Sequence, residues 1–303
     1  MSTLARIATT PRGEIEYAET GDPAAPAVFA LHGAMGGFDQ GLILARSAGL
    51  AAGFRAIAPS RPGYLGTPLA SGRTPEEQAD LFAALLDAAG VRAATVVAVS
   101  GGGPSALHFA LRHAERCRAL VLVSAASGRI EARLPFAWHV LKLAARWPAL
   151  LRAMQRRAAR DPERAMSQSI PDPAQRARLL RDPEAWGLMQ ELQRSTGDRM
   201  AQRLAGTEND IATTRGKLEL PLEQLAVPVL VVHGTADRHA PFAHAEAVAR
   251  RAPGAELLAI EGGEHACLFT HLAEIRGRIA SFLAVHPEAP APIETARAAS
   301  AAR

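Results

Sequence analysis

The 303-residue chain is poor in several kinds of residue, and each shortage excludes a class of protein. Its two cysteines, Cys117 and Cys267, lie far apart, so we expect reduced thiols and neither a disulfide scaffold nor a C-x-x-C metal site. No apolar run reaches the roughly 18 residues that a membrane-spanning helix needs. The first residues also lack the apolar core, about 7–15 residues long, of a signal peptide, so we expect a cytoplasmic protein.

Lysines and aromatic residues are also scarce. Only Lys142 and Lys217 are lysines, and aromatic side chains make up 5% of the chain. The net charge of +4 is therefore carried by arginines, which cluster in residues 152–164 and 176–181 on patterns typical of helices with solvated faces. No groove-entering motif or aromatic platform accompanies them, so we expect no nucleic-acid partner.

The most informative segment, residues 95–104, is an apolar β-branched run that ends on a serine followed by three glycines. A strand would deliver Ser100 into a turn too sharp for bulky neighbours, and Gly101 and Gly102 remove the Cβ atoms that would clash there. This pattern is typical of the nucleophile elbow G-x-S-x-G, which presents a serine hydroxyl above the edge of a sheet. Ala98 replaces the first glycine of the pattern, a difference of one methyl group.

A dinucleotide-binding loop is the alternative interpretation, because residues 101–106 also fit G-x-G-x-x-A after a strand. That fingerprint requires an acidic residue about 20 positions further on, to hydrogen-bond the ribose. The next predicted strand, residues 117–124, and the residues after it contain no acid before Glu131. The cofactor hypothesis lacks its second requirement, and we expect no cofactor.

An acid and a histidine follow the serine in the chain order that the elbow requires. Residues 227–234 form a buried-strand pattern with Asp237 in the loop beyond it, and His265 follows the last predicted strand, residues 257–260. Because parallel strands of an open sheet end at one edge, the sequence predicts that the three side chains meet there. His265 would take the proton of Ser100, and Asp237 would hold the imidazole in the required tautomer.

Together with further motifs, these residues make the chain resemble the serine hydrolases of the α/β-hydrolase fold. The resemblance covers about residues 4–284 and rests on motifs that occur in the family's order. They are His32-Gly33, Arg61-Pro-Gly-Tyr64, the elbow at Ser100, Gly-Thr-Ala-Asp237 and Gly-Gly-Glu-His265. The resemblance implies an α/β fold in which a mostly parallel eight-stranded sheet is covered by helices.

The resemblance also implies an oxyanion hole, formed by the backbone N–H groups of Ala34 and of Gly101, the residue after the nucleophile. Met35 and Phe38 are candidates for the floor of the substrate pocket. Some members of the family carry the acid after strand six instead, where this chain offers only Glu131. The serine at the elbow argues against the dehalogenase and epoxide-hydrolase branches, which use aspartate there.

The alternation of strand and helix patterns stops between the sixth and seventh predicted strands, where prolines punctuate helical patterns. We interpret residues 128–220 as a helical lid, inserted into a core of residues 1–127 and 221–285. Residues 286–303 alternate proline with alanine at first and predict a flexible tail.

The predicted lid contains an apolar stretch from Leu134 to Trp147 that is too apolar for a solvent-facing surface helix. These side chains either pack against one another or line an apolar acyl or alcohol pocket. Phe136 and Trp138 are the candidate substrate-binding residues of this stretch.

The sequence therefore predicts a serine hydrolase that cleaves a small apolar carboxylic ester through an acyl-enzyme on Ser100. Two alternatives stay open: a lactone, thioester or carbon–carbon-bond hydrolase with the same triad, and a non-catalytic ligand receptor on a hydrolase fold. The ten histidines show no metal-ligand spacing, so no metal is expected. His239 lies two residues past Asp237, which makes it a further candidate neighbour of the site. The sequence leaves the oligomeric state open.

Overall fold

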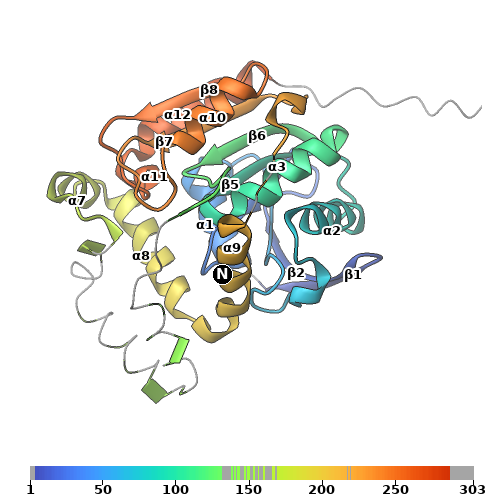
Figure 1. Cartoon of the computed structure of the whole chain (residues 1–303), viewed down its shortest axis with the longest axis horizontal. Coiled ribbons are helices and arrows are strands. Elements are labelled where there is room, and N and C mark those ends of the chain that lie inside the picture. The colour runs from blue at the N-terminus through green and yellow to red at the C-terminus, as the bar shows by residue number, and fades with distance from the viewer. Residues whose placement is uncertain are drawn as a thin grey trace, which may run out of the picture.

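A twisted sheet with helices on both faces organises the molecule (Figure 1). The computed structural model describes residues 4–131, 170–216, 218 and 220–286, together with scattered positions between 132 and 169. The strand order across the sheet is β1-β2-β4-β3-β5-β6-β7-β8. The strands are β1 (Arg6–Thr10), β2 (Gly13–Thr20), β3 (Ala27–Leu31), β4 (Arg55–Pro59), β5 (Ala94–Val99), β6 (Cys117–Val123), β7 (Val229–Gly234) and β8 (Glu256–Ile260).

Most strands of the sheet run parallel. The exceptions lie at one edge, where β1 and β2 form an antiparallel hairpin and β2 pairs antiparallel with β4. From β4 to β8 every neighbouring pair is parallel, so the carboxyl ends of these strands share one edge. The predicted α/β fold with a mostly parallel eight-stranded sheet is confirmed.

Alternate residues of the central strands supply two hydrophobic cores, one on each face of the sheet. Phe29 of β3 points to one face, where its ring lies 5.4 Å from that of Phe82 in α2. Its neighbours Val28 and Ala30 point to the other face, in the core cluster that also contains residues of α1 and α12. Because both faces are covered, these strands are apolar throughout rather than alternately polar. The covering helices are α1 (Phe38–Ser47), α2 (Pro75–Ala88), α3 (Gly103–Arg112), α10 (Ala243–Arg251), α11 (Cys267–Thr270) and α12 (Leu272–Ala284).

Further helices occupy the chain between β6 and β7, which we call the insertion (Figure 1). Asp172 and Asp182 begin the helices α7 and α8 by capping backbone N–H groups, each followed by a proline at the first helical position. The described helices are α7 (Pro173–Leu180), α8 (Pro183–Gly197), the short 3₁₀ helix η4 (Met200–Arg203) and α9 (Leu204–Arg215). Short 3₁₀ helices elsewhere are η1 (Leu69–Ser71), η2 (Ser100–Gly102), η3 (Ala114–Arg116) and η5 (Leu222–Gln224).

The insertion packs on the core at its described helices. Helix α8 contacts α1 and α11, and α9 lies against the loop that follows β4. That last contact is close because both segments have glycine there: Gly206 N–H donates to the Gly63 carbonyl at 2.8 Å. A Cβ at Gly206 would come within 2.3 Å of the Tyr64 ring, so only glycine fits this crossing. No helix in the described ranges is long and apolar enough to span a bilayer.

Candidate active site

The nucleophile elbow forms where β5 turns into η2 and α3. Ser100 adopts a left-handed backbone conformation with φ of 51°, a strained geometry for a residue with a side chain. The glycines after it are needed because two strand ends approach the turn. A Cβ at Gly102 would lie 2.7 Å from the carbonyl oxygen of His32, and one at Gly103 only 2.2 Å from that of Ala126. Ala98 is fully buried, so its methyl group is accommodated in the core.

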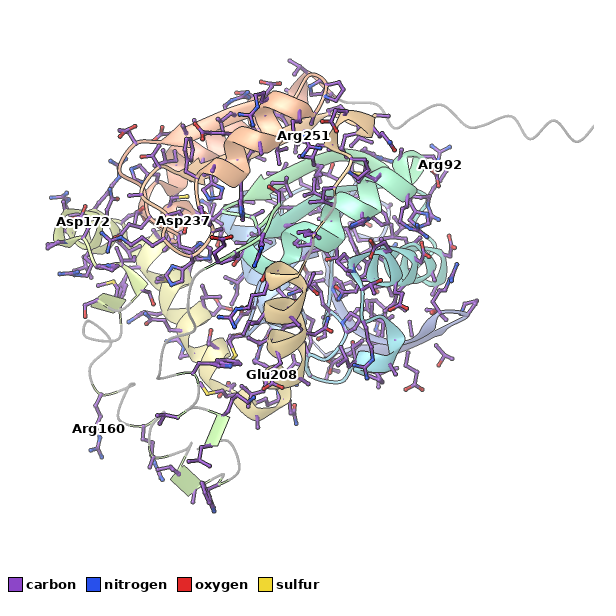
Figure 2. The ribbon with its side chains drawn as sticks, in the orientation of Figure 1. Arg92, Arg160, Asp172, Glu208, Asp237 and Arg251 are labelled. Atoms are coloured by element: carbon purple, nitrogen blue, oxygen red, sulfur yellow. The ribbon has the colours of Figure 1, made fainter. Side chains whose placement is uncertain are left out.

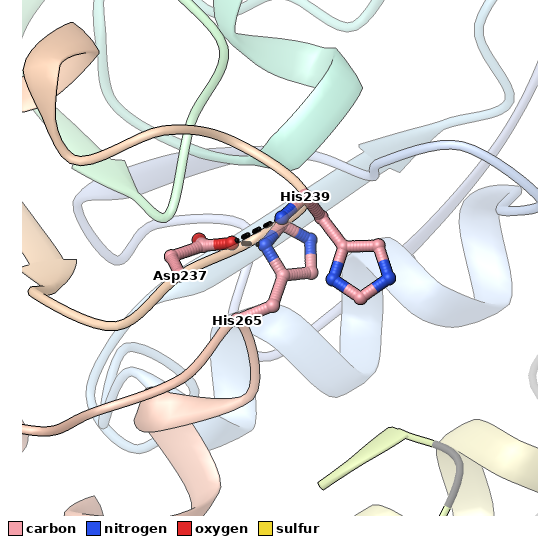
Figure 3. Close-up of side chains that lie close together, drawn as sticks. All are labelled: Asp237, His239 and His265. Carbon is pink, nitrogen blue, oxygen red and sulfur yellow. Dashed lines mark hydrogen bonds and ion pairs between the residues drawn. The ribbon is translucent and has the colours of Figure 1, made fainter. Parts of the chain in front are cut away.

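The structure brings the predicted serine, histidine and aspartate together at the carboxyl edge of the sheet. His265 Nε2 lies 3.1 Å from Ser100 Oγ, and its Nδ1 lies 2.8 Å from Asp237 Oδ2. Figure 3 shows the second of these contacts. Figure 2 labels Asp237 on the side of the molecule from which the insertion extends. With a proton on Nδ1, the imidazole donates to the carboxylate and accepts the serine hydroxyl proton at Nε2.

The Asp237 carboxylate is buried and fully engaged. Its Oδ1 accepts the backbone N–H groups of His239 at 2.8 Å and Ala240 at 3.0 Å. On the other oxygen, His265 donates, and His233 Nε2 lies 3.3 Å away while also contacting the Ala240 carbonyl at 2.9 Å. Burial raises the pKa of Asp237, but hydrogen bonds from His233 and His265 outweigh it and hold that pKa well below its usual range. The carboxylate is therefore ionised at neutral pH.

His239, the further candidate from the sequence, does lie beside the triad. Its ring centroid is 5.0 Å from that of His265 (Figure 3). One donor atom from each of Asp237, His239 and His265 lies within 4.8 Å of the others, a spacing that could hold a metal ion. However, the carboxylate oxygens already accept hydrogen bonds from neighbouring backbone and imidazole donors. A metal ion would have to displace the His265 hydrogen bond, so the geometry fits the triad better than a metal site.

The loop after β3 approaches the elbow from the other side. A Cβ at Gly33 would lie 3.0 Å from the Cβ of Ser100, and one at Gly101 would lie 3.3 Å from the backbone nitrogen of Ala34. The backbone N–H groups of Ala34 and Gly101 thus belong to two chain segments in close contact beside Ser100. Met35, the next residue, is half-buried and has a left-handed φ of 58°.

A buried ion pair lies beside this loop, and no sequence pattern indicated it. Both guanidinium Nη atoms of Arg61 bond Asp210 of α9, at 2.9 and 2.5 Å, and Tyr64 Oη donates to Asp210 at 2.5 Å. Arg61 Nε donates to the His32 carbonyl, and its backbone N–H donates to His32 Nε2, both at 2.9 Å. His32 Nε2 is therefore an acceptor, which leaves Nδ1 to donate to the Gly33 carbonyl at 2.6 Å.

The surroundings keep His32 neutral and Arg61 charged. Burial, with the nearby Arg61 charge, lowers the pKa of His32 well below its usual value. Burial also acts against the charge of Arg61, but the Asp210 carboxylate outweighs it and raises the pKa of Arg61. Asp210 Oδ2 would lie 2.9 Å from a Cβ at Gly101, so this neutralised pair borders the elbow itself.

A second ion pair joins the insertion to α1. The Arg203 side chain is fully buried and donates to Asp39 at 2.6 and 3.2 Å, and its Nε donates to the Asp198 carbonyl at 3.0 Å. Ser195 Oγ also donates to Asp39, at 2.8 Å. Burial raises the pKa of Asp39, but Arg203 outweighs it and lowers that pKa. No sequence motif marks Arg203 and Asp39 as partners, since they lie 164 positions apart.

The remaining candidates from the sequence are three pocket residues and the alternative acid. Phe38 is buried in the core cluster of α1 under the guanidinium of Arg199, so its position adds no support for a role in a pocket. Trp138 is half-buried, while Phe136 lies outside the described residues. The side chain of Glu131, the alternative acid, is 81% exposed and pairs with Arg129 rather than with His265.

Comparison with known proteins gives the family. The family model described as alpha/beta hydrolase fold matches residues 26–272. An alpha/beta hydrolase fold protein from Nakamurella multipartita is 37% identical, with a TM-score of 0.81, over 92% of this chain and 99% of that one. The uncharacterized hydrolase YcgS of Bacillus subtilis is 28% identical over 70% of this chain and 76% of its own length. An esterase from Rhodococcus sp. ECU1013 shares the fold. It is 24% identical, with a TM-score of 0.65, and the match covers 92% of this chain and 99% of the esterase chain. The chain is therefore a hydrolase of the α/β-hydrolase fold family.

Proposed function

We propose that the protein is a serine hydrolase that cleaves a small apolar carboxylic ester through an acyl-enzyme on Ser100. The observation that carries this proposal is the unbroken hydrogen-bonded series from Ser100 Oγ through His265 to Asp237, with distances of 3.1 and 2.8 Å. A free serine hydroxyl is a poor nucleophile, and this series supplies both the base and its orienting carboxylate.

In the proposed reaction Ser100 Oγ attacks the ester carbonyl carbon while its proton passes to His265 Nε2. The imidazolium formed is stabilised by Asp237, which stays ionised. The tetrahedral intermediate then collapses, the carbon–oxygen bond to the alcohol breaks, and His265 returns the proton to the leaving oxygen. A water molecule, deprotonated by His265, attacks the acyl carbon and releases the carboxylic acid with Ser100 restored.

The negative charge on the carbonyl oxygen would be stabilised by the backbone N–H groups of Gly101 and Ala34. Backbone donors suit this task because they are fixed before the reaction begins, and each contributes roughly 10²–10³ in turnover. The contact between the two segments beside Ser100 supports this assignment.

We also propose that the insertion acts as the lid and selects the substrate. Val140, Leu143 and Trp147 expose 43%, 52% and 53% of their surface, so apolar side chains of this region are available for contact. Of the two pocket candidates in this stretch, Phe136 and Trp138, Trp138 is the one among the described residues. Whether the substrate contains an open ester, a lactone, a thioester or a cleavable carbon–carbon bond depends on that pocket, because the same triad serves all four.

A fluorophosphonate probe tests the proposal, because it reacts with activated serines. In the wild type we expect stoichiometric labelling of the peptide that contains Ser100. In Ser100→Ala the label should be absent, and esterase turnover should fall by several orders of magnitude. Ser127→Ala is the matched control: this buried hydroxyl donates to the His244 carbonyl instead of His265. Absence of labelling in folded protein would favour the ligand-receptor alternative. A panel of chromogenic esters, lactones and thioesters then ranks the substrate classes.

A further inference from the structure

Met35, the residue after Ala34, is held in an unusual conformation by side chains from outside its own loop. Its φ of 58° is uncommon for a residue with a side chain, and such conformations persist only where the surroundings enforce them. The Met35 carbonyl accepts from Gln40 Nε2 at 3.1 Å and from Arg203 Nη1 at 3.4 Å. Its N–H donates to the hydroxyl of Thr207 in α9 at 3.0 Å. Two of these three partners belong to the insertion.

The Thr207 hydroxyl is well suited to hold this backbone. It is 3% exposed, and its proton is committed to the Arg203 carbonyl at 2.8 Å. With the proton used there, the hydroxyl oxygen presents a lone pair to the Met35 N–H. The Met35 N–H belongs to the peptide unit directly after that of the Ala34 N–H, and only the φ and ψ angles of Ala34 separate the two planes. Holding the second plane, with the loop also held at His32, limits the directions that the Ala34 N–H can take.

Helix α9 holds the other end of the same loop through Asp210, three residues after Thr207 and on the same side of the helix. Asp210 fixes Arg61, and Arg61 Nε donates to the carbonyl of His32. The loop is thus restrained before and after Ala34 by two residues of one insertion helix.

From these contacts we propose that Thr207 is a positioning residue for the oxyanion hole, so that the docked insertion completes the machinery that stabilises the transition state. This inference deepens the proposed function and rests on it. It adds a second role to the insertion, which then affects the rate of the chemical step for every substrate as well as the choice among substrates.

The test compares Thr207→Val with Thr214→Val in the full-length protein. Valine keeps the shape and β-branching of threonine and replaces the hydroxyl with a methyl group, which cannot hydrogen-bond. Thr214 lies on the same helix, is 8% exposed, and donates to the Asp210 carbonyl of its own helix at 2.9 Å. We expect Thr207→Val to lower kcat by about 10–100-fold, less than the loss of a whole oxyanion donor, with KM little changed. Thr214→Val should keep wild-type kinetics, and Thr207→Ser should restore most of the rate.

A boronic acid inhibitor separates positioning from a loss of folding, because its adduct with Ser100 places an oxygen in the oxyanion hole. Thr207→Val should bind this inhibitor about 10–100-fold more weakly, as expected for a weakened transition-state contact. The product acid, a ground-state ligand, should bind as tightly as it does to the wild type. The thermal midpoint of Thr207→Val should match that of Thr214→Val. Equal kcat and equal boronate affinity in the two valine variants would overturn the inference. If the wild-type protein neither reacts with fluorophosphonate nor hydrolyses any ester, the proposed serine hydrolase function itself fails. That result differs from failure of the inference about Thr207, in which the wild type is active and the two valine variants behave alike.

Discussion

The two halves of the candidate active site are built in different ways. The acid–base half consists of Asp237 and His265, in loops that follow adjacent strands of the core. Its hydrogen-bond partners come from the same loops, from His233 of β7 and from Ser100 at the elbow. The half around Ala34 is held by Thr207 and Asp210, which belong to the insertion between β6 and β7. The insertion touches the loop of His265 as well, where the Asp172 N–H contacts Glu264 Oε2 and Gln175 donates to the Gly262 carbonyl. However, core residues hold the Asp237 and His265 side chains themselves, whereas the loop around Ala34 depends directly on how the insertion docks.

This difference has a physical origin. Parallel strands fix the positions of their carboxyl ends through the hydrogen-bonded ladder, so short loops beyond them need little further support. The loop after β3 is irregular and contains a left-handed Met35, which no ladder can hold. Side chains from elsewhere must supply its hydrogen bonds: α1 contributes Gln40, and the insertion contributes Arg203 and Thr207.

The largest effect is expected in the acid–base half. Asp237→Asn should lower turnover by about 10⁴ while the fold is retained, because the amide favours the wrong tautomer of His265. Glu131→Gln is the matched control and should leave turnover unchanged, since its side chain is exposed and pairs with Arg129. Steady-state kinetics on one chromogenic ester measures both. The reverse ranking would move the acid to the loop after β6.

The sequence predicted where Asp237 and His265 lie, because each follows a recognisable strand, but it did not indicate that His233 also contacts Asp237. Ser100, Asp237 and His265 lie where parallel strands deliver them, within hydrogen-bonding distance of one another. The parallel strands β5, β6 and β7 were recognisable from their apolar runs, since burial on both faces leaves a clear signature.

The half held by the insertion could not be predicted in the same way. Asp210 and Arg61 are separated by 149 positions, and Thr207 and Met35 by 172. Contacts at such distances arise from how helices dock, which no local periodicity encodes. Arg61 belongs to a recognisable motif, but nothing in the sequence around it indicates which of the acidic residues in the insertion is its partner.

The next effect concerns the buried pair between Arg61 and Asp210. Asp210→Asn should lower the free energy of unfolding by about 3–5 kcal/mol, because Arg61 keeps its charge in a site where it is 1% exposed. Urea unfolding followed by circular dichroism measures the loss. Glu208→Gln on the same helix is the control: its side chain is 44% exposed, and its pairing with Lys142 at the surface contributes little. Figure 2 labels Glu208. A loss below about 1 kcal/mol in Asp210→Asn would mean that the insertion does not depend on this pair.

A smaller effect tests whether the insertion also selects the substrate. Trp138→Ala should change the relative kcat/KM of short and long acyl chains by about 10–200-fold, the range over which a hydrophobic pocket discriminates substrates that differ by one apolar group. The thermal midpoint should change little, because Trp138 lies outside the two core clusters of the sheet. A uniform loss for all chain lengths, with a lowered midpoint, would instead make Trp138 a packing residue of the insertion.

The smallest effect is expected at the second ion pair, where Asp39 remains partly exposed and Arg203 is buried. The pKa of Asp39 is lowered in the folded protein, so its ionised form adds stability at pH values above its unfolded pKa of about 3.9. That contribution is lost as the pH falls through the folded pKa, because the protonated carboxyl resembles an amide. Asp39→Asn should therefore be destabilised by about 1–3 kcal/mol at pH 7, less than Asp210→Asn, because Arg203 keeps the Asp198 and Met35 carbonyls as acceptors. Its difference from the wild type should begin to shrink below about pH 4 and vanish only below the folded pKa of Asp39. Thermal midpoints measured from pH 7 to about pH 3 test this, and a difference that widens at acid pH would show that packing rather than charge joins the insertion to α1.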